Sequence, residues 1–217
     1  MADSFHLLPR SLWIGIFFLI AFLSVAGMLS LAELKNQPAL PVIGQIADFT
    51  LTNQDNQVTT LAALTNHVWV ADIIFTRCAG PCPRMTGQMK SVEDLLSKDN
   101  NARLVTLTTD PDHDTPEILK RYGEHFNADF TRWTFLTGTK GEVAGLAAGS
   151  LKLGSTPVLP TDQKDAADLF IHTTIFVVVD KHARLRGVFE TGGEDVNWDK
   201  TVRPKLLATI RRLEREP

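Results

Sequence analysis

The pattern of apolar and polar residues divides the chain into one unbroken apolar segment and a longer region of alternating patterns. Residues 12–31 contain no charged side chain, and about 20 apolar residues in a helix cross a hydrocarbon core of roughly 30 Å. The pattern therefore predicts a transmembrane helix at residues 12–32 after a short tail at 1–11. A small-residue pattern at its end also fits cleavage of a signal peptide, although such peptides usually have shorter apolar regions.

A short polar and proline-containing stretch follows the apolar segment. Residues 33–42 include Pro38 and Pro41, and proline stiffens a linker. We therefore interpret 33–42 as a linker and residues 43–217 as one folded domain.

Strand and helix patterns alternate along this domain. Alternating polarity around a Gln-Asp-Asn turn predicts a hairpin, and β-branched runs predict buried strands. Apolar residues at helical spacing, such as Met85 and Met89, predict the helices and their core faces, and Thr115 and Pro116 suit the start of one of them. The expected strands are 46–61 (a hairpin), 67–75, 102–109, 133–138, 169–180 and 183–190, and the expected helices are 83–98, 115–126, 140–150 and 201–215.

This order predicts a three-layer α/β domain. Strands that alternate with helices favour a parallel sheet built by right-handed crossovers. We expect a mixed, mainly parallel central sheet to which the last two strands add an antiparallel edge. The order matches that of a thioredoxin-like fold with insertions.

Composition and charge exclude some classes of function. The chain has 217 residues, of which 44% are hydrophobic and 22% charged, and a formal net charge of -3. These are ordinary values for a globular protein. They lack the basic patch typical of a nucleic-acid-binding protein, so we expect no nucleic-acid partner.

The chain has two cysteines, and both lie in the segment "TRCAGPCPRM". Cys78 follows the strand predicted at 67–75, and Cys82 lies near the first turn of the next helix. The N-terminal end of a helix favours a thiolate, and Arg77 and Arg84 add positive charge nearby. Two buried residues without chemistry and a structural disulfide both explain this placement poorly. A redox-active dithiol and a metal site remain, and the motif alone does not separate them.

His172 is the candidate that favours the metal site. It lies in the otherwise apolar segment "LFIHTTIFVVVD", where a histidine bonded within the core is the simpler interpretation. In a thioredoxin-like fold, however, this strand begins beside the cysteine loop. Two thiolates and one imidazole would suit monovalent copper, which prefers soft ligands, better than zinc, which prefers four ligands.

Four segments together resemble the Sco/SenC family. They are "TRCAGPCPRM", "LTTDPDHDTPEILKRYGEHF", "WTFLTGT" and "IHTTIFVVVD", and their order and spacing cover roughly residues 43–212. The resemblance implies a membrane-anchored, thioredoxin-like copper chaperone rather than an enzyme. It implies copper ligands at Cys78, Cys82 and His172.

The resemblance also implies a partner and a location. Family members help to build the dinuclear copper centre of cytochrome c oxidase subunit II, so we expect that subunit or a similar copper-site protein as the partner. The domain is expected on the periplasmic side of the inner membrane, on a single-pass anchor. Two departures affect the site, because Ala79-Gly80 and Ile171 stand where the family often has Pro-Asp and Asp.

Two other functions stay open at this point. The chain could be a thiol–disulfide oxidoreductase in which Cys78 and Cys82 are the catalytic, redox-active pair. The chain has no second dithiol to recharge that pair, so a reductant protein would be needed. A copper or redox sensor is the third alternative.

Overall fold

The computed structural model describes residues 10–35, 39–96, 101–153 and 174–216, which form two compact units divided after Leu40. The first unit contains one helix, α1 (Arg10–Lys35). Its described side chains include large exposed apolar groups such as Trp13, Phe17 and Phe22. The predicted helix is thus confirmed.

The membrane span predicted at 12–32 is not confirmed. Among the residues that the structure describes, no helix combines the length and the apolar character that crossing a membrane requires.

The second unit, residues 41–217, contains the sheet and its covering helices. The hairpin, the strands and the helices predicted in it are present, with ends shifted by a few residues, although residues 169–173 of the strand predicted at 169–180 lie outside the described residues. In chain order they are β1 (Gly44–Gln45), β2 (Thr50–Asn53), β3 (Val58–Thr60), β4 (Trp69–Ile74), α2 (Pro81–Leu95), β5 (Arg103–Thr108), α3 (Pro116–His125), β6 (Trp133–Thr137), α4 (Lys140–Ala144), β7 (Ile175–Val179), β8 (Arg184–Glu190) and α5 (Arg203–Arg215). The helix of α4 continues as π-helical turns over Gly145–Ser150.

The eight strands form one sheet in the order β1-β8-β7-β4-β5-β6-β2-β3. Strand β4 pairs in parallel with β5, with Asp72 opposite Thr106, and β5 pairs in parallel with β6. On its other side β4 pairs with β7 in antiparallel register, from Trp69 opposite Val179 to Ala71 opposite Val177.

The prediction of a mainly parallel sheet is wrong, because the other pairs are antiparallel. The predicted antiparallel addition by the last two strands is present, because β7 and β8 follow β4 on one side of the parallel strands, but the two-residue strand β1 lies outside β8. Strands β6 and β7 run in opposite directions, so the connection between them begins and ends at the same end of the strands. Strand polarity patterns do not reveal such a return.

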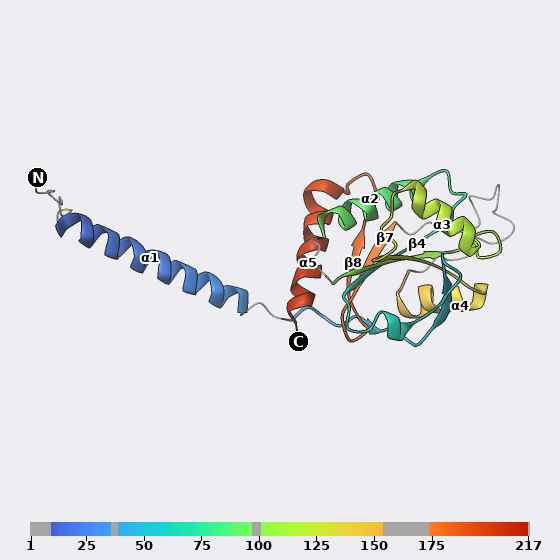
Figure 1. Cartoon of the computed structure of the whole chain (residues 1–217), viewed down its shortest axis with the longest axis horizontal. Coiled ribbons are helices and arrows are strands. Elements are labelled where there is room, and N and C mark those ends of the chain that lie inside the picture. Colours follow the sequence, from blue (N-terminus) through green and yellow to red (C-terminus); the bar gives the residue numbers. More distant parts are fainter. Residues whose placement is uncertain (1–9, 36–38, 97–100, 154–173, 217) are drawn as a thin grey trace, which may run out of the picture. The chain divides into compact units, whose positions relative to one another are not determined.

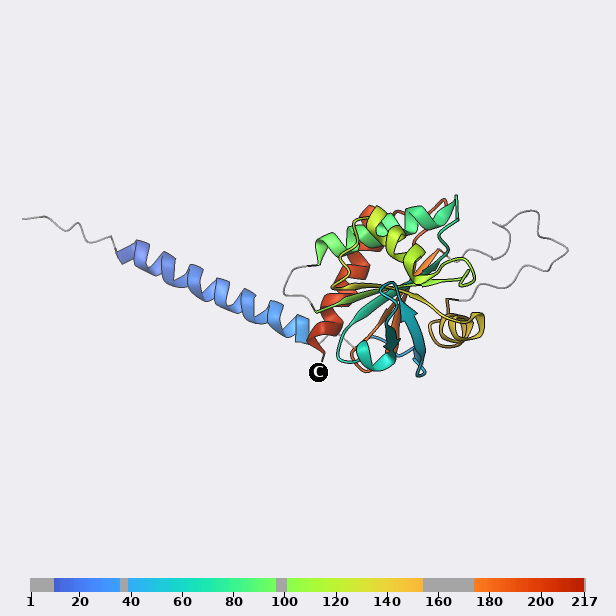
Figure 2. The ribbon, with the colours of Figure 1, turned by 45° about the vertical axis from the view of Figure 1, so that its right-hand side comes forward.

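Helices cover both faces of this sheet. Figures 1 and 2 show α2 and α3 on one side and α4 on the other. The α4 side holds the large apolar core, in which alternate residues of β4 (Trp69, Ala71 and Ile73) pack with Val143 and Leu146. Because side chains alternate along a strand, Asp72 and Ile74 point to the other side, towards α2 and α3.

Local signals explain where the helices begin. Thr115 caps α3 by accepting a hydrogen bond from the Ile118 N–H, and Pro116 takes the first helical position, as the sequence predicts. Thr139 and Glu142 form a capping box at the start of α4. These caps end the loops that follow β5 and β6 at defined residues.

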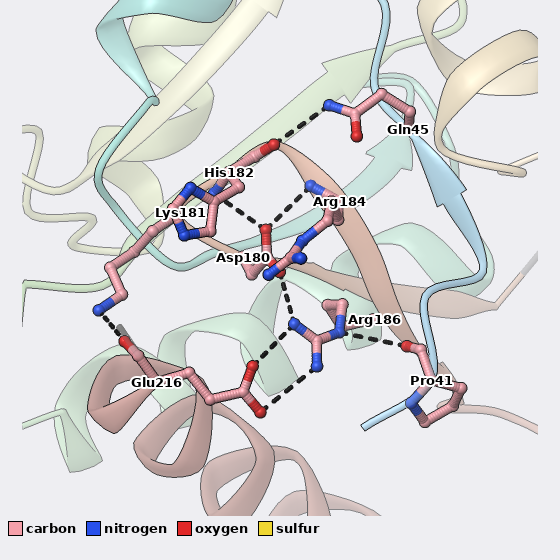
Figure 3. A network of polar contacts seen from close by, with 8 residues as sticks. All are labelled: Pro41, Gln45, Asp180, Lys181, His182, Arg184, Arg186 and Glu216. Atoms are coloured by element: carbon pink, nitrogen blue, oxygen red, sulfur yellow. Dashed lines mark hydrogen bonds and ion pairs between the residues drawn. The ribbon is translucent and has the colours of Figure 1, made fainter. Parts of the chain in front are cut away.

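A buried ion-pair network joins the turn between β7 and β8 to the end of α5 (Figure 3). The Arg186 guanidinium donates to Asp180 Oδ2 at 2.6 Å and to Glu216 Oε2 at 2.8 Å, and its Nε donates to the Pro41 carbonyl oxygen. Burial opposes ionisation of Asp180, but hydrogen bonds from Arg186 and Arg184 keep its pKa below the ordinary value. The network ties the first residues of the domain to its last.

Replacing Arg186 by Met should lower the free energy of unfolding by about 3–5 kcal/mol, because the nearly buried Asp180 would lose its main counter-charge. Urea unfolding measures this change. The matched control is Arg121→Met, which breaks an exposed ion pair with Glu117 on α3 and should leave the midpoint almost unchanged. Equal effects of the two substitutions would contradict the proposed role of the network.

Candidate thiol and metal site

The two cysteines lie where the central strand β4 passes into α2. Cys78 lies in the turn after β4, and its N–H donates to the Phe75 carbonyl oxygen at 3.2 Å. Pro81 and Cys82 are the first two residues of α2, and Gly80 is the N-cap. Gly80 has a negative φ, and an added Cβ would meet no atom within 4 Å. Packing therefore does not explain the glycine that departs from the family pattern.

Both thiols are free and buried, with 5% of Cys78 and 3% of Cys82 exposed. They pack with Ile74 and Phe75, and the partly buried Tyr122 of α3 closes the cluster. Cys78 and Cys82 belong to this same cluster. The structure thus brings together the two cysteines that the sequence singles out and surrounds them with apolar side chains.

This apolar cluster overturns one expectation about the thiols. Burial raises the pKa of Cys82 well above its ordinary value, and the neighbouring thiol of Cys78 raises it further. The start of the helix does not compensate, because the helix-end effect is small beside the cost of burying a charge. Without a metal, Cys82 is therefore a neutral thiol rather than the thiolate that the sequence predicts.

The two nearby arginines do not offset this effect. Arg77 is half-exposed and forms an ion pair with Asp110 at 2.5 Å. The guanidinium of Arg84 lies beside Gly192, where an added Cβ would collide with it. Both positive charges point to other parts of the domain.

A tyrosine on α3 supports the helix that carries Cys82. Thr86 Oγ1 donates to the Cys82 carbonyl oxygen at 3.0 Å and lies 2.8 Å from the Tyr122 hydroxyl. Since the Thr86 hydroxyl has one proton, the Tyr122 hydroxyl donates to it. This hydrogen bond requires α3 to lie close to the sheet. Gly123 allows that approach, because a side chain at this position would collide with Phe135. Tyr122 therefore links α3 to the first turn of α2.

The acidic turn between β5 and α3 holds the segment that leads to Cys78. The carboxylate of Asp114, which is fully buried, accepts hydrogen bonds from the Thr76 N–H at 3.1 Å and from the Thr76 hydroxyl at 2.5 Å. It also accepts from the Thr108 hydroxyl and contacts His113 Nδ1 at 2.9 Å. Each carboxylate oxygen is thus satisfied, and Asp114 clamps the chain two residues before the first thiol.

A second buried carboxyl group, Asp72, lies on the same face of the sheet as the thiols. It has no exposed surface, and its Oδ1 accepts a hydrogen bond from Thr106 Oγ1 at 2.7 Å. Burial raises the pKa of Asp72 from 3.8 to about 7, although the Thr106 hydrogen bond opposes the rise. Asp72 is not among the site residues predicted from the sequence. The signal was available, because Asp72 is the one charged residue in the apolar strand segment "VWVADIIF".

His172 lies outside the described residues, so the third predicted ligand has no described position. The described chain resumes at Thr174, whose carbonyl oxygen accepts hydrogen bonds from the N–H and hydroxyl of Thr191. Gln88 of α2 donates to the Thr191 carbonyl oxygen at 3.0 Å. Among the described residues, no three histidine, cysteine, aspartate or glutamate side chains lie close enough together to hold a metal ion.

Met85 and Met89, which could also offer soft sulfur ligands, are fully buried side chains of α2. Their spacing of one helical turn and their burial mark the face of α2 that packs on the sheet. They are core residues, as the helical spacing predicts.

The fold and the site together define a class of protein. Solved structures of similar fold confirm the mixed α/β domain. One is a structure of BsSco, described as a member of the Sco family of cytochrome c oxidase assembly proteins with a disulfide switch. It is 25% identical, has a TM-score of 0.66, and covers 83% of this chain and 100% of its own. This class is the thioredoxin-like Sco domain.

The chain belongs to the SCO1/SenC family, whose model matches residues 42–203. The SCO1 protein homolog of Bacillus subtilis (strain 168) is 30% identical over 165 residues, which is 73% of this chain and 82% of that protein. The structure of Bradyrhizobium japonicum ScoI with copper bound has a TM-score of 0.62 at 22% identity and covers 78% of this chain and 99% of its own. At that identity it supports the fold alone.

Replacing Asp114 by Asn should release the segment before Cys78, because an amide N–H group would face the donors of Thr76. We expect a loss of about 1–3 kcal/mol in the free energy of unfolding and faster hydrogen exchange at the Thr76 amide. Urea unfolding and amide exchange measure the two effects. Asp112→Asn in the same turn is the control, because Asp112 is exposed and pairs only with Lys140 among the described side chains. Unchanged exchange at Thr76 would show that Asp114 is no clamp.

Proposed function

We propose that this protein is a copper chaperone, not an enzyme, that binds monovalent copper through Cys78, Cys82 and His172 and delivers it to a copper-site protein. The observation that carries the proposal is the pair of free, buried and adjacent thiols at the end of β4. Two thiols in an apolar cluster form a soft ligand pair, which monovalent copper prefers.

The arrangement of β7 supports His172 as the third ligand. Because β7 runs antiparallel to β4, its first residue lies at the edge of the sheet where β4 ends. The side chains of Thr174 and Arg84 both crowd Gly192, so Thr174 lies near the start of α2. His172 precedes Thr174 by two residues, and an extended chain spans about 3.3–3.6 Å per residue. The start of β7 at this end of the sheet therefore supports His172 as the third ligand.

The buried site suits the capture and transfer of copper. Metal binding requires thiolates, so the thiols lose their protons when copper enters and regain them when it leaves. The apolar cluster raises the pKa of Cys82, which favours release of copper to an acceptor that offers its own thiolates. Transfer then proceeds by stepwise exchange of sulfur ligands. A disulfide between Cys78 and Cys82 would block copper binding, so the redox state gates loading.

The relatives support the cargo and the partner. One fold relative has copper bound, and BsSco is described as an oxidase assembly protein with a disulfide switch. On this basis we propose that the acceptor is subunit II of cytochrome c oxidase or a similar copper-site protein.

A second candidate function is thiol–disulfide exchange with the cysteines of that acceptor. The contact between the two free thiols favours it, since they can close a disulfide after reducing a partner. Such a cycle needs an external reductant protein to restore the dithiol.

Replacing His172 by Ala separates the two functions. As a copper ligand, His172 should contribute at least as much as an outer-shell partner, so we expect a loss of copper(I) affinity of at least about 10–100-fold. Competition with a chromophoric chelator measures it, and X-ray absorption of the wild type should show two sulfurs and one nitrogen. The control is His125→Ala, which removes an exposed histidine of α3. Unchanged copper affinity together with intact disulfide reduction would favour the exchange function.

We also propose that the domain acts on the periplasmic side of the inner membrane, attached through its N-terminal region. The exposed apolar side chains of α1 support this proposal, because large exposed apolar surfaces mark interaction sites. Alkaline phosphatase folds only outside the cytoplasm, so its fusion to Pro217 should be active and should sediment with membranes. An inactive fusion would exclude this location.

A further inference from the structure

The buried carboxyl group of Asp72 lies one step along β4 from the thiol cluster. Residues two apart on a strand share a face and lie about 7 Å apart. Asp72 therefore lies beside Ile74, and Ile74 packs directly with Cys78 and Cys82. The carboxyl group and the thiols share the layer between the sheet and α2.

The surroundings of Asp72 satisfy only one of its two oxygens. Thr106 Oγ1 accepts a hydrogen bond from Trp133 Nε1 at 2.9 Å, so its own proton is directed to Asp72 Oδ1. Asp72 Oδ2 is buried and has no hydrogen-bond partner among the described residues. A buried carboxylate needs partners at both oxygens. This environment therefore suits a group that gains and loses a proton.

The other titratable groups on this side of β4 are few. Cys78 and Cys82 come from α2 and its preceding turn, and Tyr122 comes from α3; negative charge on Asp72 opposes ionisation of Cys82 and of Tyr122. The sheet neighbours Thr106 and Trp133 do not titrate, and β7 contains no titratable residue. On α2, Lys90 pairs with Glu93 and Asp94. Asp114 bonds to Thr76 at the end of the strand.

We propose that Asp72 takes up a proton when copper binds the thiols and gives it up when copper leaves. The proposal rests on the copper-binding function above. Two thiolates with one monovalent copper ion carry a net negative charge, and a second buried negative charge on the same face of the sheet is strongly repelled. Of the two protons that the thiols release, one therefore passes to the Asp72 carboxylate and the other leaves the protein. The negative charge of the loaded metal site then replaces that of Asp72, so the total buried charge of the site and Asp72 together is the same in the empty and loaded states.

The test counts the protons released when copper(I) binds. Calorimetric titration of the reduced full-length protein with copper(I), without oxygen and in buffers of different ionisation enthalpy, gives this number. At about pH 8, where Asp72 is ionised in the empty protein, the wild type should release one proton fewer per copper than Asp72→Asn. At about pH 5.5 Asp72 is already protonated, so the two proteins should release equal numbers.

Each outcome is decisive for one of the two proposals. If copper binds and both proteins release equal numbers of protons at pH 8, the role of Asp72 is overturned. If the wild type binds no copper, the proposed function fails. Asp72→Ala replaces Asp72→Asn if the asparagine variant does not fold, and it should give the same difference. Thr137→Val is the matched control, because it removes a buried and unpartnered hydroxyl of β6 without removing a charge.

A copper-free measurement decides the role of Asp72 if no copper binds. Loss of the Asp72 charge should increase the thiolate fraction at pH 8. Lower nucleophilicity offsets part of this increase, so the thiols of Asp72→Asn should react with iodoacetamide faster than those of the wild type, but by less than the increase in thiolate. The rates should converge near pH 5.5, whereas general loosening of the fold would raise them at both pH values. Equal rates at pH 8 would overturn the proposal.

Discussion

The site depends on one constraint, the complete burial of the central strand β4. All of its residues from Trp69 to Ile74 are buried, with β5 paired along one edge and β7 along the other. A strand held on both edges and both faces cannot shift its register without exposing its core residues. The turn that carries Cys78 begins where this strand ends. The position of the first thiol is therefore set by the centre of the sheet and not by the loop.

Two buried carboxyl groups near that thiol differ in the number of hydrogen bonds that they accept. Asp114 accepts hydrogen bonds at both oxygens, so it holds the chain before Cys78 in place. Asp72 has one partnered oxygen and a raised pKa. The number of hydrogen-bond donors explains the difference between the two groups, because burying an ionised carboxylate without donors costs much free energy. One group serves as a fixed clamp, and the other is suited to exchanging a proton.

Much of the secondary structure, and the position of the two cysteines within it, followed from local patterns. The helix start at Thr115 and Pro116, the hairpin around Asp55 and the core face of Met85 and Met89 were all predicted, because capping and periodicity are local properties. The predominance of antiparallel pairs was not predicted, since strand direction depends on the end of the sheet to which each connection returns. The ionisation of Cys82 was predicted with the wrong sign, because helix position is visible in a sequence and desolvation by distant residues is not.

The sequence by itself determined the elements of the domain. It also determined that both cysteines, Cys78 and Cys82, lie at one strand–helix junction. It also identified the family, whose model covers residues 42–203. Only the tertiary structure decided that both thiols are buried, that burial raises the pKa of Cys82, and that Thr76 is clamped by a carboxylate 38 residues away. It alone placed Asp72 on the thiol side of the sheet. The reason is that burial and charge at this site come from neighbours that the fold, and not the chain order, brings together.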